Sequence, residues 1–229
     1  MLENKYKGCG LALVIYFDNL FKNIIKEVNV KMAKRVFFSF DYEDVKTFRV
    51  NVVRNHYLTK DRDDAGFFDA SIWEDAKKHG DISVKRLINS GLENTSVTCV
   101  LIGSETWQRR WVRYEILKSY DRGNSLFGVH INKLPDKNQE TFKNGLNPFD
   151  YLGFIVSNDG KTVTYYEHDG KEWEIYQDLK PNGSSIFDKQ HWGRGFKLSD
   201  WVPCYDWVKN DGYNNFVDWI ENADSKAGK

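Results

Sequence analysis

A strand-like apolar run that passes directly into a helical pattern constrains this chain more than any other feature. The run covers residues 97–102 and ends at Gly103, and the helical pattern occupies residues 106–121. One stripe of this helix can face a core and consists of Val112, Ile116 and Tyr120. A neighbouring stripe consists of Trp107, Trp111 and Glu115. The sequence therefore predicts a carboxylate beside aromatic surface, near the end of a buried strand.

Similar strand and helix patterns recur along the first half of the chain. Strands are predicted at 35–40, 66–70, 97–102 and 125–131. Helices are predicted at 45–53 after a cap by Asp41 or Asp44, at 81–91 with Gly91 as a stop, and at 106–121 with Gly123 as a stop. Residues 71–80 are predicted to be a polar loop. Strand starts about thirty residues apart indicate strand–helix–strand units. We therefore expect a flavodoxin-like α/β fold, a parallel sheet with helices on both faces.

The pattern changes after Pro135. Residues 135–152 are loop-like, and residues 153–176 predict a three-stranded antiparallel meander because both of its turns contain Asp-Gly. A loop is predicted for 180–200, and a final helix passes through Phe216 and Ile220. We predict a domain at 32–153 and a C-terminal extension, 154–229, packed on it. Residues 1–31 are predicted to be a dispensable extension, and Met32 just before the first strand is consistent with a start codon there.

Composition excludes several classes of function. Lysine plus arginine equals aspartate plus glutamate, 33 against 33, which gives no support for nucleic-acid or membrane binding. The three cysteines and five histidines lack metal-ligand spacing, and the cysteine pattern fits a reducing cytoplasm. No Walker pattern occurs, and no Gly-x-Gly-x-x-Gly follows the first strand. These absences argue against an NTPase and a hydride-transferring dehydrogenase.

Ligands of open parallel sheets bind outside the carboxyl ends of the strands. The polar and aromatic residues predicted near those ends are Ser39, Phe40, Asp41, Tyr42, Ser71, Trp73, Gly103, Ser104, His130 and Asn132. Aromatic density here suits a pocket for a flat heteroaromatic ring. Spacing alone leaves two readings of Glu115 open: a functional carboxylate, or an exposed residue paired with Lys118 at i+3.

Several blocks in the same order resemble the TIR-like proteins of bacterial Thoeris anti-phage systems, the ThsB family. The blocks are Lys34–Phe40, Phe68–Asp75, Ser96–Ser104, Arg110–Ile116 and Asn147–Gly153. Within them, Trp111-Val-Arg-Tyr-Glu115 is similar to the tryptophan-to-glutamate signature of TIR domains. The resemblance extends from about Met32 through at least Gly153.

This resemblance implies an enzyme that cleaves the nicotinamide–ribose bond of NAD and cyclises the ADP-ribose. The cyclic product would activate a separate NAD-depleting effector. Carried over by position, Glu115 is the catalytic residue; the substrate-binding residues are Phe40, Asp41, Ser71, Trp73, Ser104 and Trp111. The resemblance also implies NAD as substrate with no metal or other cofactor, a phage-derived trigger, a homo-oligomer on activation, and a cytoplasmic location without nucleic-acid or membrane partners.

Two departures keep an alternative function open. Residues 73–80, Trp-Glu-Asp-Ala-Lys-Lys-His-Gly, replace the usual Arg-Asp…Pro-Gly of the second TIR box, and the Phe-Trp of the third box has no counterpart. The alternative is therefore a non-catalytic TIR-like interaction or sensor module. A phospho-receiver is excluded, because its third strand would need to end in aspartate and here ends in Gly103-Ser104.

Overall fold

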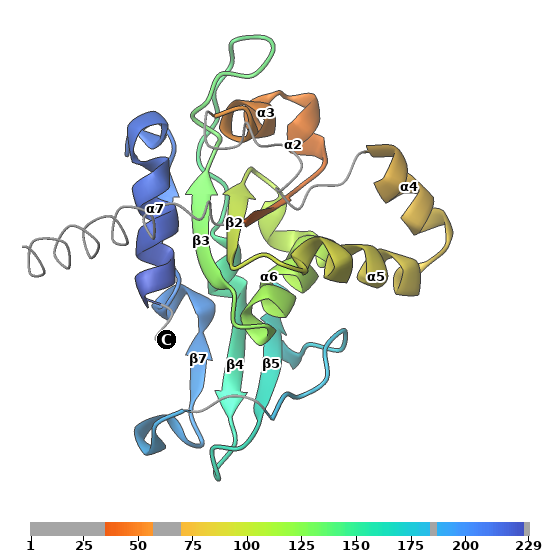
Figure 1. The fold of residues 1–229 in the computed structure, drawn as a ribbon, viewed down its shortest axis with the longest axis vertical. Coiled ribbons are helices and arrows are strands. Elements are labelled where there is room, and N and C mark those ends of the chain that lie inside the picture. The colour runs from red at the N-terminus through yellow and green to blue at the C-terminus, as the bar shows by residue number, and fades with distance from the viewer. Residues whose placement is uncertain (1–34, 57–69, 184–186, 227–229) are drawn as a thin grey trace, which may run out of the picture. The chain divides into compact units, whose positions relative to one another are not determined.

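A four-stranded parallel sheet forms the centre of the protein. The computed structural model describes residues 35–56, 70–183 and 187–226. The sheet has the order β1-β2-β3-β8 (Figure 1). Its strands are β1 (Val36–Phe40), β2 (Val97–Ile102), β3 (Ser125–His130) and β8 (Cys204–Asp206). All three pairings are parallel, so the carboxyl ends of these strands meet at one edge.

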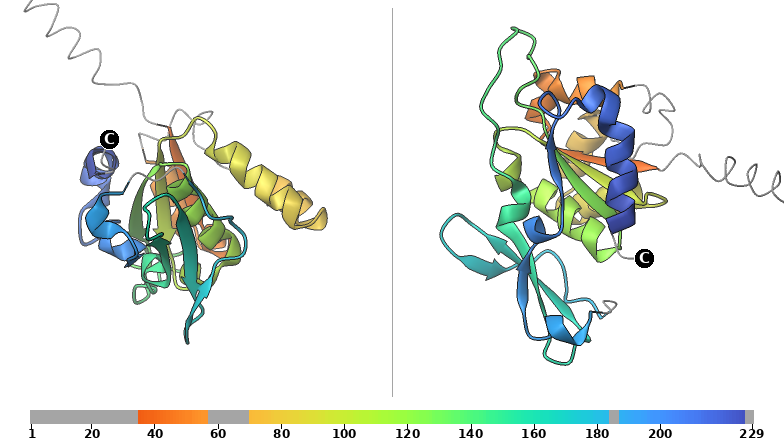
Figure 2. Two further views of the ribbon diagram at one scale, coloured as in Figure 1. Left: turned by 90° about the horizontal axis from the view of Figure 1, so that it is seen from below. Right: turned by 90° about the vertical axis from the view of Figure 1, so that its left-hand side faces the viewer.

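Both faces of this sheet are covered by helices. Alternate side chains such as Phe38 and Leu101 pack in one cluster with α3 (Arg49–Arg54) and α7 (Gly212–Lys226). The opposite set, such as Phe37 and Val100, packs with α5 (Asp81–Leu92) and α6 (Arg110–Asp121). Figure 2 shows α7 on one side of the sheet and α6 on the other. The predicted flavodoxin-like architecture, a TIR-like α/β fold, is therefore confirmed.

The fourth strand of the sheet comes from a part of the chain where the sequence indicated none. β8 pairs with β3 in the register Gly128↔Cys204. Gly128 permits this approach, because a Cβ there would lie 2.7 Å from the Cys204 sulfur. A three-residue strand has too little periodicity to be recognised locally. Strand β8 and helix α7 thus belong to the layers of the parallel sheet, while the division of the chain into domains stays a prediction.

A second sheet is antiparallel and has the order β6-β5-β4-β7. Its strands are β4 (Leu152–Val156), β5 (Val163–His168), β6 (Trp173–Ile175) and β7 (Gly195–Lys197). The predicted meander of β4, β5 and β6 is confirmed, with Gly160 and Gly170 at positive φ in its two turns. The loop prediction for 180–200 is wrong in part, since β7 pairs with β4 and the 3₁₀ turns Lys189–His191 and Leu198–Asp200 flank it.

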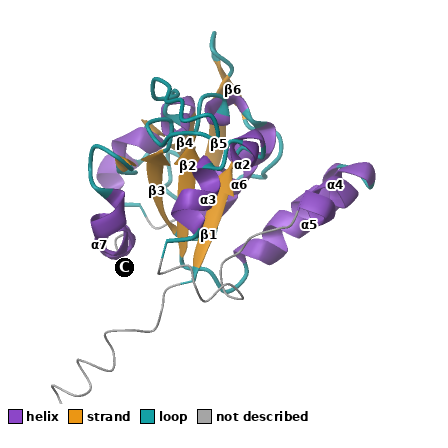
Figure 3. Ribbon diagram, turned by 90° about the horizontal axis from the view of Figure 1, so that it is seen from above, coloured by secondary structure: helices purple, strands orange, loops and turns teal. Residues whose placement is uncertain are grey.

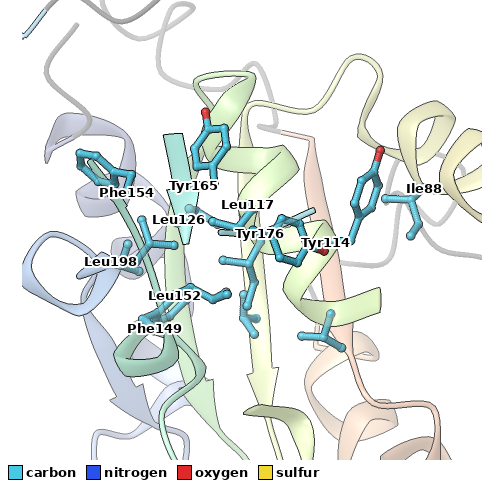
Figure 4. Packing of buried hydrophobic residues seen from close by; sticks show 14 of the residues in the cluster. Ile88, Tyr114, Leu117, Leu126, Phe149, Leu152, Phe154, Tyr165, Tyr176 and Leu198 are labelled. Atoms are coloured by element: carbon cyan, nitrogen blue, oxygen red, sulfur yellow. The ribbon is translucent and has the colours of Figure 1, made fainter. Parts of the chain in front are cut away.

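Helix α6 lies between the two sheets. It packs on β1, β2 and β3 of the parallel sheet. On its other side, the Tyr120 ring stacks on Phe154 of β4 at 5.0 Å. Figure 4 shows Leu117 of α6 in one buried cluster with Leu126 of β3 and Tyr165 of β5. The helix that carries the Trp111–Glu115 block is therefore held from both sides.

Three local predictions differ from the structure. The helix predicted at 45–53 is split into α2 (Glu43–Lys46) and α3, because Phe48 adopts φ 67° between them. Residues predicted to be a polar loop, 71–80, instead form most of α4 (Ala70–Lys78). Trp73 and the buried Ala76, three positions apart, give that helix one packing face that its charged residues obscured in the sequence. Helix 106–121 starts with a 3₁₀ turn, Thr106–Gln108.

The remaining elements complete the description. Helices α4 and α5 both extend away from the parallel sheet (Figure 3), and α5 ends one residue beyond the predicted stop. A 3₁₀ turn, Pro148–Tyr151, precedes β4. The strand predicted at 66–70 and the extension at 1–31 lie outside the described residues, except that Ala70 begins α4. None of the helices within the described ranges is long and apolar enough to cross a membrane.

Candidate functional site

Glu115 lies inside the protein, on the side of α6 that faces β1. Its exposed fraction is 7%, and its Oε2 accepts a hydrogen bond of 2.5 Å from the Ser39 hydroxyl. The exposed pairing with Lys118 is therefore wrong. Lys118 instead donates to Asp121 at 2.6 Å. Helical periodicity turns Glu115 inward together with Ser119, whose hydroxyl accepts a hydrogen bond from Thr98 of β2.

Burial changes the acidity of this carboxyl group. Removing the carboxylate from water raises the pKa of Glu115 to about 8, and the hydrogen bond from Ser39 opposes that rise. At neutral pH the group is mostly protonated, and a small change in its surroundings can ionise it. A glutamate with a pKa near the working pH is typical of active sites.

The segment after β1 carries two further carboxylates, Asp41 in the loop and Asp44 in α2. Asp41 accepts a bond from Arg109 Nε at 2.7 Å, and its other oxygen accepts from the Glu43 backbone N–H at 3.2 Å. Asp44 packs so closely on Gly103 that a methyl group there would overlap its carboxylate. Burial and the charge of Asp41 raise the pKa of Asp44 to about 6, although Arg49 and Arg109 oppose this. The ends of β1 and β2 are thus joined through acidic side chains.

The loop after β3 meets the same edge of the sheet. Asn132, which is 1% exposed, donates to the Ser104 hydroxyl at 2.8 Å. Its own side-chain oxygen accepts from the Gly145 backbone N–H at 3.3 Å. Gly145 lies directly against the Gly103 carbonyl, where any side chain would overlap. Residues 132–145 therefore return to the end of β2 and hold Ser104 there.

The two tryptophans around α6 lie on different sides of it. Trp111 is partly buried against the core, edge-on to Tyr114 at 6.2 Å and under the Arg110 guanidinium at 4.6 Å. Trp107 stacks at a tilt on Tyr151, 4.5 Å away, just before β4. Neither ring is a free surface residue. Both rings pack around the start of α6, the helix that carries Glu115.

A buried arginine fastens this region to the second sheet. Arg113 donates to the Trp107 carbonyl at 3.0 Å, to Glu167 at 2.6 Å and to the His168 carbonyl at 3.1 Å. It is 7% exposed, so its charge is neutralised almost entirely by these partners. The meander thereby fixes the turn that leads into α6.

The structure brings some of the predicted site residues together and leaves others apart. Asp41 and Ser104 lie at the carboxyl edge of the sheet, while Glu115 and Trp111 are one helical turn apart on α6. Phe40 packs with the cluster on the opposite face of the sheet from Ser39, as strand alternation requires. Ser71 and Trp73 are on α4, where Ser71 is exposed and Trp73 packs against the core.

Four residues that were not among the predicted catalytic and substrate-binding residues make the contacts of the site. They are Ser39, Arg109, Arg113 and Asn132. The sequence placed Ser39 and Asn132 at strand ends without giving them a role, and alternation along β1 places Ser39 opposite Phe40. Arg109 and Arg113 have the composition of an exposed helix face and gave no signal. Among the described residues, no group of three or more potential metal ligands lies close enough to hold an ion.

Comparison with known proteins gives two matches. Residues 37–136 match the family model described as "Thoeris protein ThsB, TIR-like domain". A protein of Bacillus cereus (strain MSX-D12), named "Putative cyclic ADP-D-ribose synthase ThsB1", is 57% identical over 191 residues. That alignment covers 82% of this chain and 100% of the relative.

Proposed function

The chain belongs to the ThsB family of TIR-like proteins, and on that basis we propose that it cleaves NAD and cyclises the ADP-ribose. The relative that it matches over that protein's full length is named as a cyclic ADP-D-ribose synthase. The observation that supports the reaction most directly is Glu115, a buried carboxyl group at the end of β1 whose pKa is about 8. We assign it as the catalytic residue.

The chemistry explains why a buried glutamate is suited to this reaction. When the bond between the nicotinamide nitrogen and the ribose carbon breaks, the electron pair leaves with nicotinamide and positive charge develops on the ribose. An ionised Glu115 stabilises that charge, and its effect is large because little water reaches it. A nucleophilic atom of the same ADP-ribose then bonds to the ribose carbon, and the proton that this group loses on bond formation passes to the carboxylate or to water. Exclusion of water favours this closure over hydrolysis.

The substrate itself helps to ionise Glu115. The nicotinamide ring of NAD is cationic, and a positive charge beside a carboxyl group lowers its pKa. Binding of NAD therefore opposes the effect of burial, which raised the pKa of Glu115 to about 8. We expect kcat/KM to rise with pH up to about 8, and kcat to reach its plateau at lower pH. No cofactor besides the substrate NAD is part of this proposal.

The enzymatic proposal is tested by product analysis. Purified protein is incubated with NAD in buffer and in lysate from phage-infected cells, and nicotinamide and the nucleotide product are identified by mass spectrometry. We expect a product with the mass of cyclic ADP-ribose from the wild type and none from Glu115→Gln. The matched control is Glu93→Gln, which changes an exposed glutamate at the end of α5. Equal activity of Glu115→Gln and wild type in both media contradicts the assignment.

The cyclic product is the signal of an anti-phage system. We further propose that it acts on a separate NAD-depleting effector, that a phage-derived component triggers synthesis in the cytoplasm, and that the active form is a homo-oligomer. Helices α4 and α5 support the last point, since they expose Ile72 and Ile82 by 48% and 68%.

The same exposed residues favour one alternative, a non-catalytic interaction module. That alternative predicts that Glu115→Gln retains phage protection, whereas Ile72→Glu abolishes it. The enzymatic proposal predicts loss of protection with Glu115→Gln. Plaque counts on cells carrying each variant together with the effector distinguish the two.

A further inference from the structure

Two hydroxyl groups tie α6 to the parallel sheet, one turn apart. The Ser39 hydroxyl of β1 donates to Glu115 at 2.5 Å, and the Thr98 hydroxyl of β2 donates to Ser119 at 2.8 Å. Ser39, Thr98 and Ser119 are fully buried. The first contact involves the candidate catalytic group, and the second joins two neutral groups. The hydrogen bond between Thr98 and Ser119 can therefore serve as a control for the hydrogen bond between Ser39 and Glu115.

The Ser39 contact distinguishes the two oxygens of the Glu115 carboxyl group. The hydroxyl is bonded to Oε2, and no other described residue donates a hydrogen bond to this carboxyl. Because Ser39 is fully buried in a strand paired with β2, its position is fixed by the sheet. The side chain of Glu115 is thereby held in one orientation, with Oε1 left without a donor from the described part of the chain.

We infer that Ser39 is a positioning residue for the reaction, holding Oε2 of Glu115 so that Oε1 is the oxygen presented to the ribose of NAD. This inference rests on the proposed function. Ser39 itself does not touch the substrate. It acts by fixing the carboxylate before the positive charge develops, which removes the cost of reorienting it during the reaction.

The charged residues around Glu115 contact other groups, so Ser39 is its hydrogen-bond partner among the described residues. Strands β1 and β2 carry no charged residue. The cations on the first turns of α6 are engaged elsewhere: Arg109 with Asp41, Arg110 with Asp178, and Arg113 with Glu167. Lys118 and Asp121 pair with each other, and Asp44 packs on Gly103. Burial is the largest influence on the pKa of Glu115, and the bond from Ser39 lowers it.

The test compares Ser39→Ala with Ser119→Ala. Each variant removes one of the two buried hydroxyl contacts between α6 and the sheet, but only Ser39→Ala affects the carboxyl group. A hydrogen bond to a charged group contributes enough to expect a fall in kcat of about ten- to a hundredfold in Ser39→Ala, with KM nearly unchanged. The rising limb of the kcat/KM profile should move up by about one pH unit, because the bond that lowers the pKa is gone.

Ser39→Thr provides the conservative variant, since it keeps the hydroxyl on a β-branched residue that strands accept. We expect it to return the limb to the wild-type pH even if the extra methyl group lowers thermal stability. The inference is overturned if the rising limb of the kcat/KM profile stays at the wild-type pH in Ser39→Ala, or if it moves equally far in Ser119→Ala.

A second measurement separates this inference from the proposed function. If the wild type does not turn over NAD, the proposed function fails, and the contact is then tested by urea unfolding across pH. The free energy of unfolding falls as pH rises toward the pKa of folded Glu115, and Ser39→Ala should make this fall continue to higher pH. In a Glu115→Gln background, Ser39→Ala should have no such effect. If the pH range is the same with and without the hydroxyl, the contact does not set the state of Glu115 and the positioning role is wrong.

Discussion

Replacing Glu115 with glutamine is expected to stabilise the protein while abolishing its activity. Glutamine has nearly the same size and shape, and its side-chain oxygen can still accept the hydrogen bond from Ser39. What disappears is the ability to ionise. A charged carboxylate inside the protein is unfavourable relative to the unfolded chain, where water solvates it. The variant therefore removes a cost that the wild type carries for its function.

The size of this effect follows from the pKa of Glu115. The ordinary value is 4.5 and the buried value is about 8, so the folded protein binds more protons than the unfolded chain between these pH values. Stability of the wild type then falls as pH rises through this range, by about 1.4 kcal/mol per pH unit. Relative to glutamine, the loss amounts to about 3 kcal/mol at pH 7 and about 5 kcal/mol at pH 9. At pH 4 the two proteins should be equally stable.

The assay is equilibrium unfolding in urea at pH 4, 7 and 9, with wild type and Glu115→Gln measured side by side. For a domain of this size, about 3 kcal/mol corresponds to a rise in Tm of about 6–12 °C at pH 7. The slopes against urea should agree, which shows that the compactness of the unfolded states is the same. Glu93→Gln serves as the exposed control and should follow the wild type. A difference that does not change with pH, or a less stable Glu115→Gln protein at pH 7, refutes the reasoning.

Three other changes follow from contacts in the structure. Asp44→Asn should raise the free energy of unfolding by about 3 kcal/mol at pH 8 and not at pH 3.5, because burial raises the pKa of this carboxyl from 3.8 to about 6. Urea unfolding at both pH values measures the difference. Gly145→Ala should lower Tm by several degrees, since its methyl group would overlap the Gly103 carbonyl after β2. The control is Gly183→Ala, whose methyl group meets only ordinary contacts and should leave Tm unchanged. Calorimetry measures both. Arg113→Met should cost about 1–3 kcal/mol, because the Trp107 and His168 carbonyls lose their buried donor while the partly exposed Glu167 can be rehydrated. Arg110→Met, at a half-exposed pair, should cost less than about 1 kcal/mol in the same unfolding experiment.

Local sequence patterns determined those parts of the fold whose residues interact with near neighbours along the chain. The β2 strand needed only its six buried residues, and α6 needed only its spacing of apolar side chains. The meander was predictable because Asp-Gly favours the positive φ that Gly160 and Gly170 adopt. The family was recognisable because several blocks occurred in order, and the comparisons confirm it.

Elements that depend on distant partners were not predictable in this way. Strand β8 has three residues and exists because β3 offers a free edge and Gly128 admits Cys204. Helix α4 was mistaken for a loop, since its charged residues outnumber the two that pack. Phe48 interrupts a helix that its neighbours favour, through a backbone conformation that no side-chain pattern signals.

The state of Glu115 shows most clearly what the tertiary structure decided. From its spacing the residue could also have been exposed and paired with Lys118, because periodicity gives the face of a helix but not what covers that face. Packing of α6 between two sheets buries it, and this burial raises its pKa. Its partner Ser39 is 76 residues away along the chain. The pKa of this carboxyl group is therefore set by the fold, which removes water from it and places a hydroxyl group against it.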